Sequence, residues 1–140
     1  VCKLFSISNK AKYALAAMFT LAMSAQNESV QAKQLAAQCQ IPIKFLEHIL
    51  SDLRQTGLVR SQRGSKGGYF LAKSSEKIMV SDIIVVIDGP IKLSSGYCGG
   101  ATLIEFWQSV EVQLKMVLSL PLSELVLNKQ KKEQVINYAI

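Results

Sequence analysis

The chain has 140 residues, which is room for one domain, or for one domain with an appended dimerisation element. Its 49% hydrophobic and 19% charged residues exclude an intrinsically disordered chain. The net charge of +6 favours a polyanionic partner, and three cysteines without disulfide-like spacing favour the reducing cytoplasm.

Helical periodicity predicts three helices in the first part of the chain. The first is capped by Ser8 or Asn9 and runs to about residue 24. Its apolar run is too short to span a membrane, so we expect no membrane partner. A short second helix is predicted at about residues 32–38. The third begins at Pro42, a residue that suits a helix start, and ends near residue 56, where Gly57 follows.

A glycine-rich connection then joins two strand-like segments, residues 58–62 and 69–73. The connection reads Arg-Gly-Ser-Lys-Gly-Gly, and three glycines there allow positive φ angles or a close backbone approach. We therefore predict a β-hairpin. The order of two short helices, a strand, a hairpin tip and a second strand is that of a winged helix-turn-helix.

The second part of the chain is predicted to be helical apart from one loop. A helix at about residues 81–87 is followed by a Gly-rich loop over 88–100 and a long helix from about residue 101. Apolar residues recur on the long helix at steps of four and three, which is typical of a helix–helix seam. The predicted dimerisation residues are Leu103, Trp107, Val110, Leu114 and Val117. Pro121 interrupts the seam, and Ser123 suits the cap of a last short helix.

These elements predict a mostly α fold with a small β-hairpin wing. We expect a winged helix-turn-helix DNA-binding domain over residues 1–80. Residues 81–128 are expected to form an effector loop and a long C-terminal dimerisation helix, and residues 129–140 a basic C-terminal tail.

The third helix separates an apolar from a polar face. Its apolar positions, at core spacing, are Phe45, Leu46, Ile49, Leu50 and Leu53. The opposite stripe offers donors, acceptors and cations, which a recognition helix needs for base edges and phosphates. Any solvated helix face is also polar, so this stripe alone does not decide between the two interpretations.

The hairpin adds a stronger signal, because residues 53–75 contain five cations and no acidic residue. A basic, glycine-rich tip suits the minor groove, where the backbone must come close and the potential is negative. The candidate DNA-binding residues are Lys44, Glu47, His48, Ser51, Arg54, Arg60, Arg63, Gly64, Ser65, Lys66, Gly67, Gly68 and Tyr69.

The same region carries a family resemblance. The motifs are Phe-Leu-Glu-His-Ile-Leu at 45–50, Gly-Leu-Val at 57–59 and Arg-Gly-Ser-Lys-Gly-Gly-Tyr at 63–69. They resemble the signature of the Rrf family of winged-helix transcription regulators (IscR/NsrR/CymR-like proteins). The resemblance extends over nearly the whole chain up to the tail, and the wing motif is its specific part.

The resemblance implies a homodimer that binds an approximately palindromic site in double-stranded DNA. It implies that Glu47 accepts hydrogen bonds from cytosine amino groups and that Arg63 reaches into the minor groove. The wing glycines would shape the tip. Tyr69 would either contact DNA or pack the wing against the body of the domain.

The resemblance is weakest at the regulatory site. Cluster-binding members carry three cysteines in the loop before the long helix, whereas this loop holds only Cys98. Ala101 and Ile104 stand where those relatives have a cysteine and a histidine, and Lys12 stands where others have an acidic ligand. We therefore assign no set of metal ligands. Cys98 is kept as the effector or redox candidate, with an iron–sulfur cluster, a redox-responsive thiol or a merely structural residue as alternatives.

Other functions are less well supported. His48 is the only histidine and has no nucleophile at motif spacing, and residues 64–67 lack the frame of a phosphate loop, so we expect no enzyme. Gly-Ser-Lys-Gly at 64–67 formally matches the loop of KH-type RNA-binding domains, but strand-like segments flank it here. A cluster-free regulator controlled by a partner protein and a protein-interaction module remain alternatives.

Overall fold

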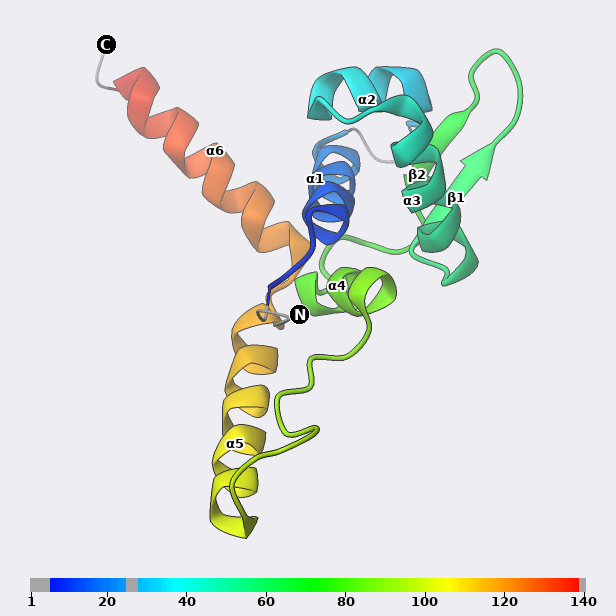
Figure 1. Ribbon diagram of the computed structural model, residues 1–140. Coiled ribbons are helices and arrows are strands. Elements are labelled where there is room, and N and C mark those ends of the chain that lie inside the picture. Colours follow the sequence, from blue (N-terminus) through cyan, green and yellow to red (C-terminus); the bar gives the residue numbers. More distant parts are fainter. Residues whose placement is uncertain (1–5, 25–27, 139–140) are drawn as a thin grey trace.

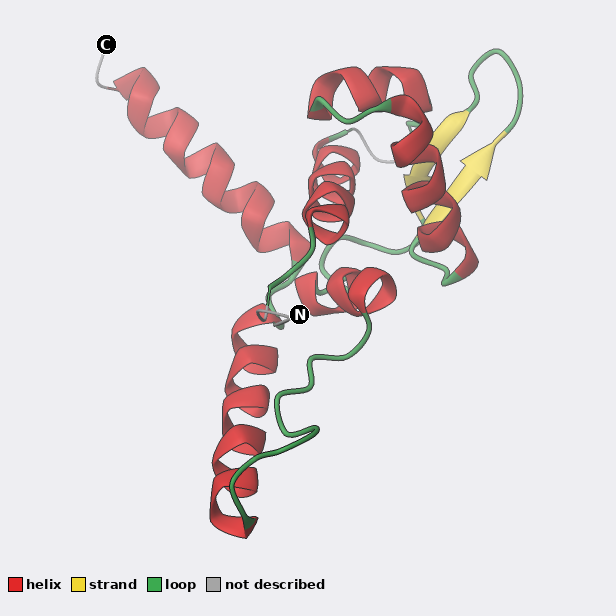
Figure 2. Cartoon of the chain, in the orientation of Figure 1, coloured by secondary structure: helices red, strands yellow, loops and turns green. Residues whose placement is uncertain are grey.

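The structure is a computed structural model that describes residues 6–24 and 28–138 of the chain (Figure 1). The helices are α1 (Asn9–Met23), α2 (Ala32–Cys39), α3 (Ile43–Gln55), α4 (Val80–Asp88), α5 (Ala101–Leu118) and α6 (Leu122–Tyr138). The strands β1 (Val59–Gln62) and β2 (Gly68–Leu71) form one antiparallel hairpin. Figure 2 shows that helices dominate and that the hairpin projects from one side. The predicted fold class, a mostly helical winged helix-turn-helix, is confirmed.

Helix α1 lies at the centre of the N-terminal half of the chain and packs against α2, α3, α4, α6 and β2. Ser8 caps it, since its Oγ accepts a hydrogen bond from the Ala11 N–H at 3.0 Å. The buried face of α1 consists largely of small side chains. Its members are Ala11, Ala14, Ala17, Met18 and Leu21. Because alanine adds little volume, the neighbouring helices approach α1 closely.

The break between α2 and α3 is a tight turn at Gln40, which has a φ of 56°. The Ile41 N–H bonds back to the Ala36 carbonyl at 3.0 Å, and Pro42 then precedes the first residue of α3. Four of the predicted core residues of α3 are fully buried: Leu46, Ile49, Leu50 and Leu53. These two helices and their turn form the helix-turn-helix.

One predicted core residue of α3 is not in the core, because Phe45 is 42% exposed. Successive residues of a helix are about 100° apart, so Phe45 lies at the edge of the stripe centred on Leu46 and Leu50. Its ring is nearly perpendicular to the ring of Tyr13 on α1, with centroids 5.7 Å apart. Phe45 therefore covers the α1–α3 boundary from outside.

The hairpin is docked onto the segment that precedes α2. Tyr69 exchanges both backbone hydrogen bonds with Val30, each at 2.8 Å. Gly68, at the start of β2, has a φ of +155°, and a Cβ there would lie 2.5 Å from the Val30 carbonyl oxygen. A glycine is thus needed at position 68 because the two backbones lie too close for any side chain.

Helices α5 and α6 diverge from a common junction (Figure 1), which is hydrogen-bonded to the residues around the start of α4. The Val80 N–H donates to the Leu120 carbonyl at 2.9 Å, and the Leu122 N–H donates to the Ile78 carbonyl at 2.8 Å. Leu122 and Ile78 are both fully buried there. No helix in the described ranges is long and apolar enough to cross a membrane.

Helix α6 differs from the prediction of a short last helix followed by a tail. It has 17 residues and continues without a break past residue 128, where we placed the start of the tail. Its sequence contains neither glycine nor proline, and Lys129 lies 3.9 Å from Glu133 one turn later. Ser123 lies inside the first turn instead of at the cap.

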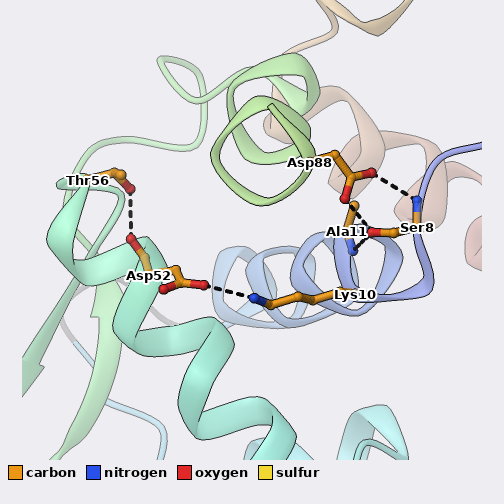
Figure 3. A network of polar contacts seen from close by, with 6 residues as sticks. All are labelled: Ser8, Lys10, Ala11, Asp52, Thr56 and Asp88. Atoms are coloured by element: carbon orange, nitrogen blue, oxygen red, sulfur yellow. Dashed lines mark hydrogen bonds and ion pairs between the residues drawn. The ribbon is translucent and has the colours of Figure 1, made fainter. Parts of the chain in front are cut away.

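A polar network at the start of α1 joins three helices (Figure 3). The Ser8 N–H and hydroxyl donate to the Asp88 carboxylate at the end of α4, and Lys10 pairs with Asp52 of α3 at 3.1 Å. The Thr56 hydroxyl donates to the Asp52 carbonyl at 3.1 Å, closing the end of α3. Half-exposed pairs of this kind add little stability, so the network serves mainly to orient α3 against α1.

The contact between the wing and Val30 predicts different effects for two wing glycines. Gly68→Ala should lower the free energy of unfolding by about 2 kcal/mol or more, because a Cβ would overlap the Val30 backbone and the φ is unfavourable. Gly64→Ala, with a φ of +112° and open space around it, should cost only about 1 kcal/mol. Urea unfolding of both variants measures the two free energies. Equal losses of stability would show that the close approach between the Gly68 and Val30 backbones does not set the cost.

Candidate nucleic-acid interface

The polar stripe of α3 lies on the surface of the molecule. Lys44, Glu47, His48 and Arg54 are exposed, and Ser51 is half-buried. Their positions recur every three or four residues, which places them on one side of the helix, opposite the buried leucines. The stripe therefore offers a carboxylate, an imidazole and two cations along one helix face.

The tip of the wing is also exposed. Arg60, Arg63, Ser65 and Lys66 are exposed, as is Gly64, whereas the remaining wing candidates, Gly67, Gly68 and Tyr69, are half-buried. The Ser29 hydroxyl donates to the Lys66 carbonyl at 2.6 Å, which ties the tip to the segment before α2. Ser29 is not predictable from the sequence, because nothing there links it to a hairpin far away in the chain.

Helix α3 and the wing are connected where α3 ends. A guanidinium nitrogen of Arg54 lies 3.5 Å from the Ser61 hydroxyl on β1. This contact sets one cation of the helix beside the first strand of the wing. Residues 64–67 join two strands, whereas a KH-type loop joins two helices, so this geometry disfavours the RNA-binding alternative.

The cations of this surface are not neutralised by the protein. In the described part of the chain, the ion pairs are Lys10–Asp52 and Lys129–Glu133, and neither involves α3 cations or the wing. Unpaired, exposed Arg and Lys side chains attract phosphate groups and release counterions on contact with nucleic acid. The helix stripe and the wing thus form one basic surface, which we call the basic surface below.

The loop over residues 89–100 is fastened to α5 through Glu111. The carboxylate accepts hydrogen bonds from the backbone N–H groups of Ser94, at 2.7 Å, and Leu93. The Ser94 and Leu93 N–H groups hold the pKa of Glu111 below its ordinary value. The contact therefore persists at a pH at which an ordinary glutamate is already protonated. It weakens only as the pH falls through the lowered pKa of Glu111.

Cys98 lies inside this loop and is only 8% exposed. Its thiol donates to the Ser94 carbonyl at 3.2 Å, with the Gly96 carbonyl at 3.6 Å. Cys39 packs at the edge of the helix-turn-helix core beside Thr20, and Cys2 falls outside the described residues.

The donor set around Cys98 does not fit an iron–sulfur cluster held by one chain. Over residues 6–24 and 28–138, no three His, Cys, Asp or Glu side chains come together as a metal site. An iron–sulfur cluster needs several thiolates in one place, and the loop supplies a single one.

Helix α5 has no buried residue, although it is rich in apolar side chains. Of the predicted seam, Leu103, Trp107 and Val117 are 48%, 38% and 75% exposed, while Val110 and Leu114 are half-buried. The exposed apolar surface is wider than that seam. It also includes Ile104, Phe106, Val112 and Met116. The narrow heptad pattern missed these residues because they fall outside positions a and d.

Comparison with known proteins identifies the family. Residues 7–126 match the family described as "Rrf2: Iron-dependent Transcriptional regulator". An rrf2-like HTH-type transcriptional regulator of Rhodobacter capsulatus is 46% identical over 88 residues, which are 61% of this chain and 59% of that protein.

Solved structures agree with this assignment. T. potens IscR is similar with a TM-score of 0.79 and 30% identity, over 91% of this chain and 90% of that chain. The global cysteine regulator of B. subtilis, CymR (YrzC), is similar with a TM-score of 0.79 and 33% identity, over 87% of this chain and 96% of that one. The family resemblance predicted from the wing motif is confirmed. This chain belongs to the Rrf2 family of DNA-binding, HTH-type transcriptional regulators, which are not enzymes, and it is similar to IscR and CymR.

Proposed function

We propose that this regulator acts in the cytoplasm as a homodimer that recognises specific sites in double-stranded DNA. The observation that carries the proposal is the basic surface, in which exposed cations on α3 and the wing have no acidic partner among the described residues. Their electrostatic attraction to phosphates supplies affinity for any duplex. Sequence specificity has to come from contacts with base edges and from groove shape.

Helix α3 suits the major groove. Lys44, Glu47 and His48 stand on its N-terminal half, the part that contacts base edges in helix-turn-helix complexes. Arg54 stands near its C-terminal end, where a cation suits the phosphate backbone. Glu47 accepts a hydrogen bond from a cytosine amino group, and its charge is repelled by phosphate when no such donor is present.

The wing suits the neighbouring minor groove. Arg63 stands at its exposed tip, where the narrow groove has the most negative potential. Glycines at positions 64 and 67 keep the tip thin, so the backbone comes close to the sugar–phosphate walls. Ser29 supports this role by holding the tip to the body of the domain.

A homodimer accounts for the exposed apolar face of α5. Two copies of this face bury each other in a self-complementary contact with two-fold symmetry. Two recognition helices then bind a pseudo-palindromic site, with half-sites about one or two helical turns apart. The loop over residues 89–100, which we call the effector loop, joins the DNA-binding half (α1–α4 with the wing) to this dimer helix. We therefore propose it as the point of effector or redox control, with Cys98 as its candidate residue.

The proposal predicts that Arg63→Ala weakens specific DNA binding by about 1–3 kcal/mol. The slope of log K against log salt concentration should fall by about one, which corresponds to one lost phosphate contact. Fluorescence anisotropy with a duplex selected from a random pool measures both. Lys131→Ala, an exposed cation on α6, is the matched control because it removes the same charge elsewhere. Equal losses in the two variants would indicate unspecific attraction and would contradict the wing contact.

Glu47 is predicted to act on base preference. Glu47→Ala should flatten the discrimination between the selected site and its single-base variants more than it lowers affinity, because it removes both an acceptor and a charge repelled by phosphate. Affinity measured across all single-base variants of the site tests this. A uniform loss over every variant would contradict the assigned role.

The dimer contact predicts that Trp107→Gln shifts the protein towards monomer. Truncating a large aromatic side chain at an interface costs about 2 kcal/mol or more, so the dimer dissociation constant should rise roughly thirtyfold or more. Sedimentation equilibrium measures it. Tyr97→Gln is the control, since Tyr97 is an aromatic residue that is 98% exposed in the loop and outside the α5 face. An unchanged dimer with Trp107→Gln would mean that another surface holds the copies together.

A further inference from the structure

A cavity of about 680 Å³ lies where the DNA-binding half meets α5. Thr56, Leu58 and Lys73, which lie near the end of α3 and the base of the wing, line it from the DNA-binding half. Helix α5 contributes Val112 and Lys115. The volume of the cavity falls within the range of about 300–1,000 Å³ that is usual for small-molecule sites.

The lining of the cavity is mainly apolar. Helix α4 contributes Ile84, Val85 and Val86, the effector loop contributes Ile91, and α5 adds Leu118. Of these, Ile84 is buried, whereas Val85 is 43% exposed. An apolar body of a ligand would therefore remove these side chains from water, which is favourable in proportion to the area covered.

The charged groups of the cavity are of two kinds: carboxylates that already accept backbone hydrogen bonds, and ammonium groups that form no ion pair within the described ranges. Asp82 accepts a hydrogen bond from the Met79 N–H at 3.0 Å, and Glu111 holds the N–H groups of the effector loop. Among the described residues, neither Lys73 nor Lys115 takes part in an ion pair. Lys115 lies one turn after Glu111, the usual pairing distance, but that carboxylate is turned to the loop.

We propose that this cavity binds a small organic acid, with its apolar body on α4 and the loop and its carboxylate held by Lys115 and Lys73. An anion is favoured over a cation because both carboxylates of the lining already accept backbone hydrogen bonds, while both ammonium groups keep donors to offer. The inference rests on the proposed function, since it names the chemical class of effector for this regulator and the site at which it acts.

The position of the cavity links the ligand to DNA binding. Lys73 belongs to the segment that follows the wing, and Lys115 belongs to the helix of the proposed dimer. A carboxylate bound to both would fix the wing base relative to α5. Glu111 and Ile91 also line the cavity, so the ligand would contact the fastened loop directly. A ligand is allosterically coupled to DNA binding when it binds two arrangements of these halves with different affinity.

The test is calorimetric titration of the full chain with octanoate and hydrocinnamate, each compared with its primary amide. At least one acid should bind roughly tenfold or more tightly than its amide, because the amide lacks the charge that two lysines recognise. Lys115→Gln should remove that preference, whereas Lys131→Gln, on an exposed turn of α6, should keep it. Acids that bind no better than their amides, or a Lys115→Gln protein with unchanged preference, would overturn the proposal.

A second measurement addresses regulation. The saturating acid should change the affinity for the selected duplex roughly fivefold or more, and saturating duplex should change the affinity for the acid by the same factor. Acid binding without any such change would overturn the regulatory part of the proposal. Acid binding is measured without DNA, so the two proposals can fail separately. A protein that binds the duplex but no acid contradicts this inference alone. A protein that binds the acid but no duplex contradicts the proposed function and leaves the assignment of the cavity intact.

Discussion

The close packing of α1 is the interaction on which the rest of the structure depends. Its buried alanines let α3 and α4 approach, and the polar contacts at its first turn orient the same two helices. The wing follows from this arrangement, because β2 packs on α1 and is bonded to Val30 just before α2. A larger side chain at Ala14 or Ala17 would push these elements apart, and the helix face and the wing would no longer present their cations on one surface.

The apolar residues of the chain serve two different purposes. Those of α1 and α3 are largely buried within the chain and hold the DNA-binding half together, whereas those of α5 stay exposed or half-buried. Exposed apolar area of this extent is typical of an interaction surface and not of a folded monomer's ordinary exterior. The two halves therefore owe their stability to different partners: the first to its own core, the second, in our proposal, to another copy of the chain.

The sequence predicts those features that depend on local periodicity. Leu46, Ile49, Leu50 and Leu53 recur at helical spacing and are all buried, and the strands, glycine-rich tip and family resemblance followed from residues close together in the chain. Features that need contacts between distant segments were not predictable. The partner of Gly68 is a backbone carbonyl near α2, the partners of Glu111 are N–H groups of a loop, and Phe45 is exposed because only one side of α3 faces α1. The length of α6 is not predictable in this way, because its charged and polar residues suit a solvated tail as well as a helix, and none of them breaks a helix.

Two connections link the DNA-binding half to α5: the α5–α6 junction, which is held firmly, and the effector loop, which is held by few contacts. At the α5–α6 junction, backbone hydrogen bonds on both sides of Met79 and Pro121 surround buried side chains, so movement there would expose core residues. The effector loop, in contrast, is held to α5 by one carboxylate, and its thiol bonds only within the loop. Releasing it breaks few hydrogen bonds, so a small free energy is enough to shift it. In our proposal, this loop serves regulation although it holds a single thiol, because the effector acts on the loop and on the cavity wall beside it.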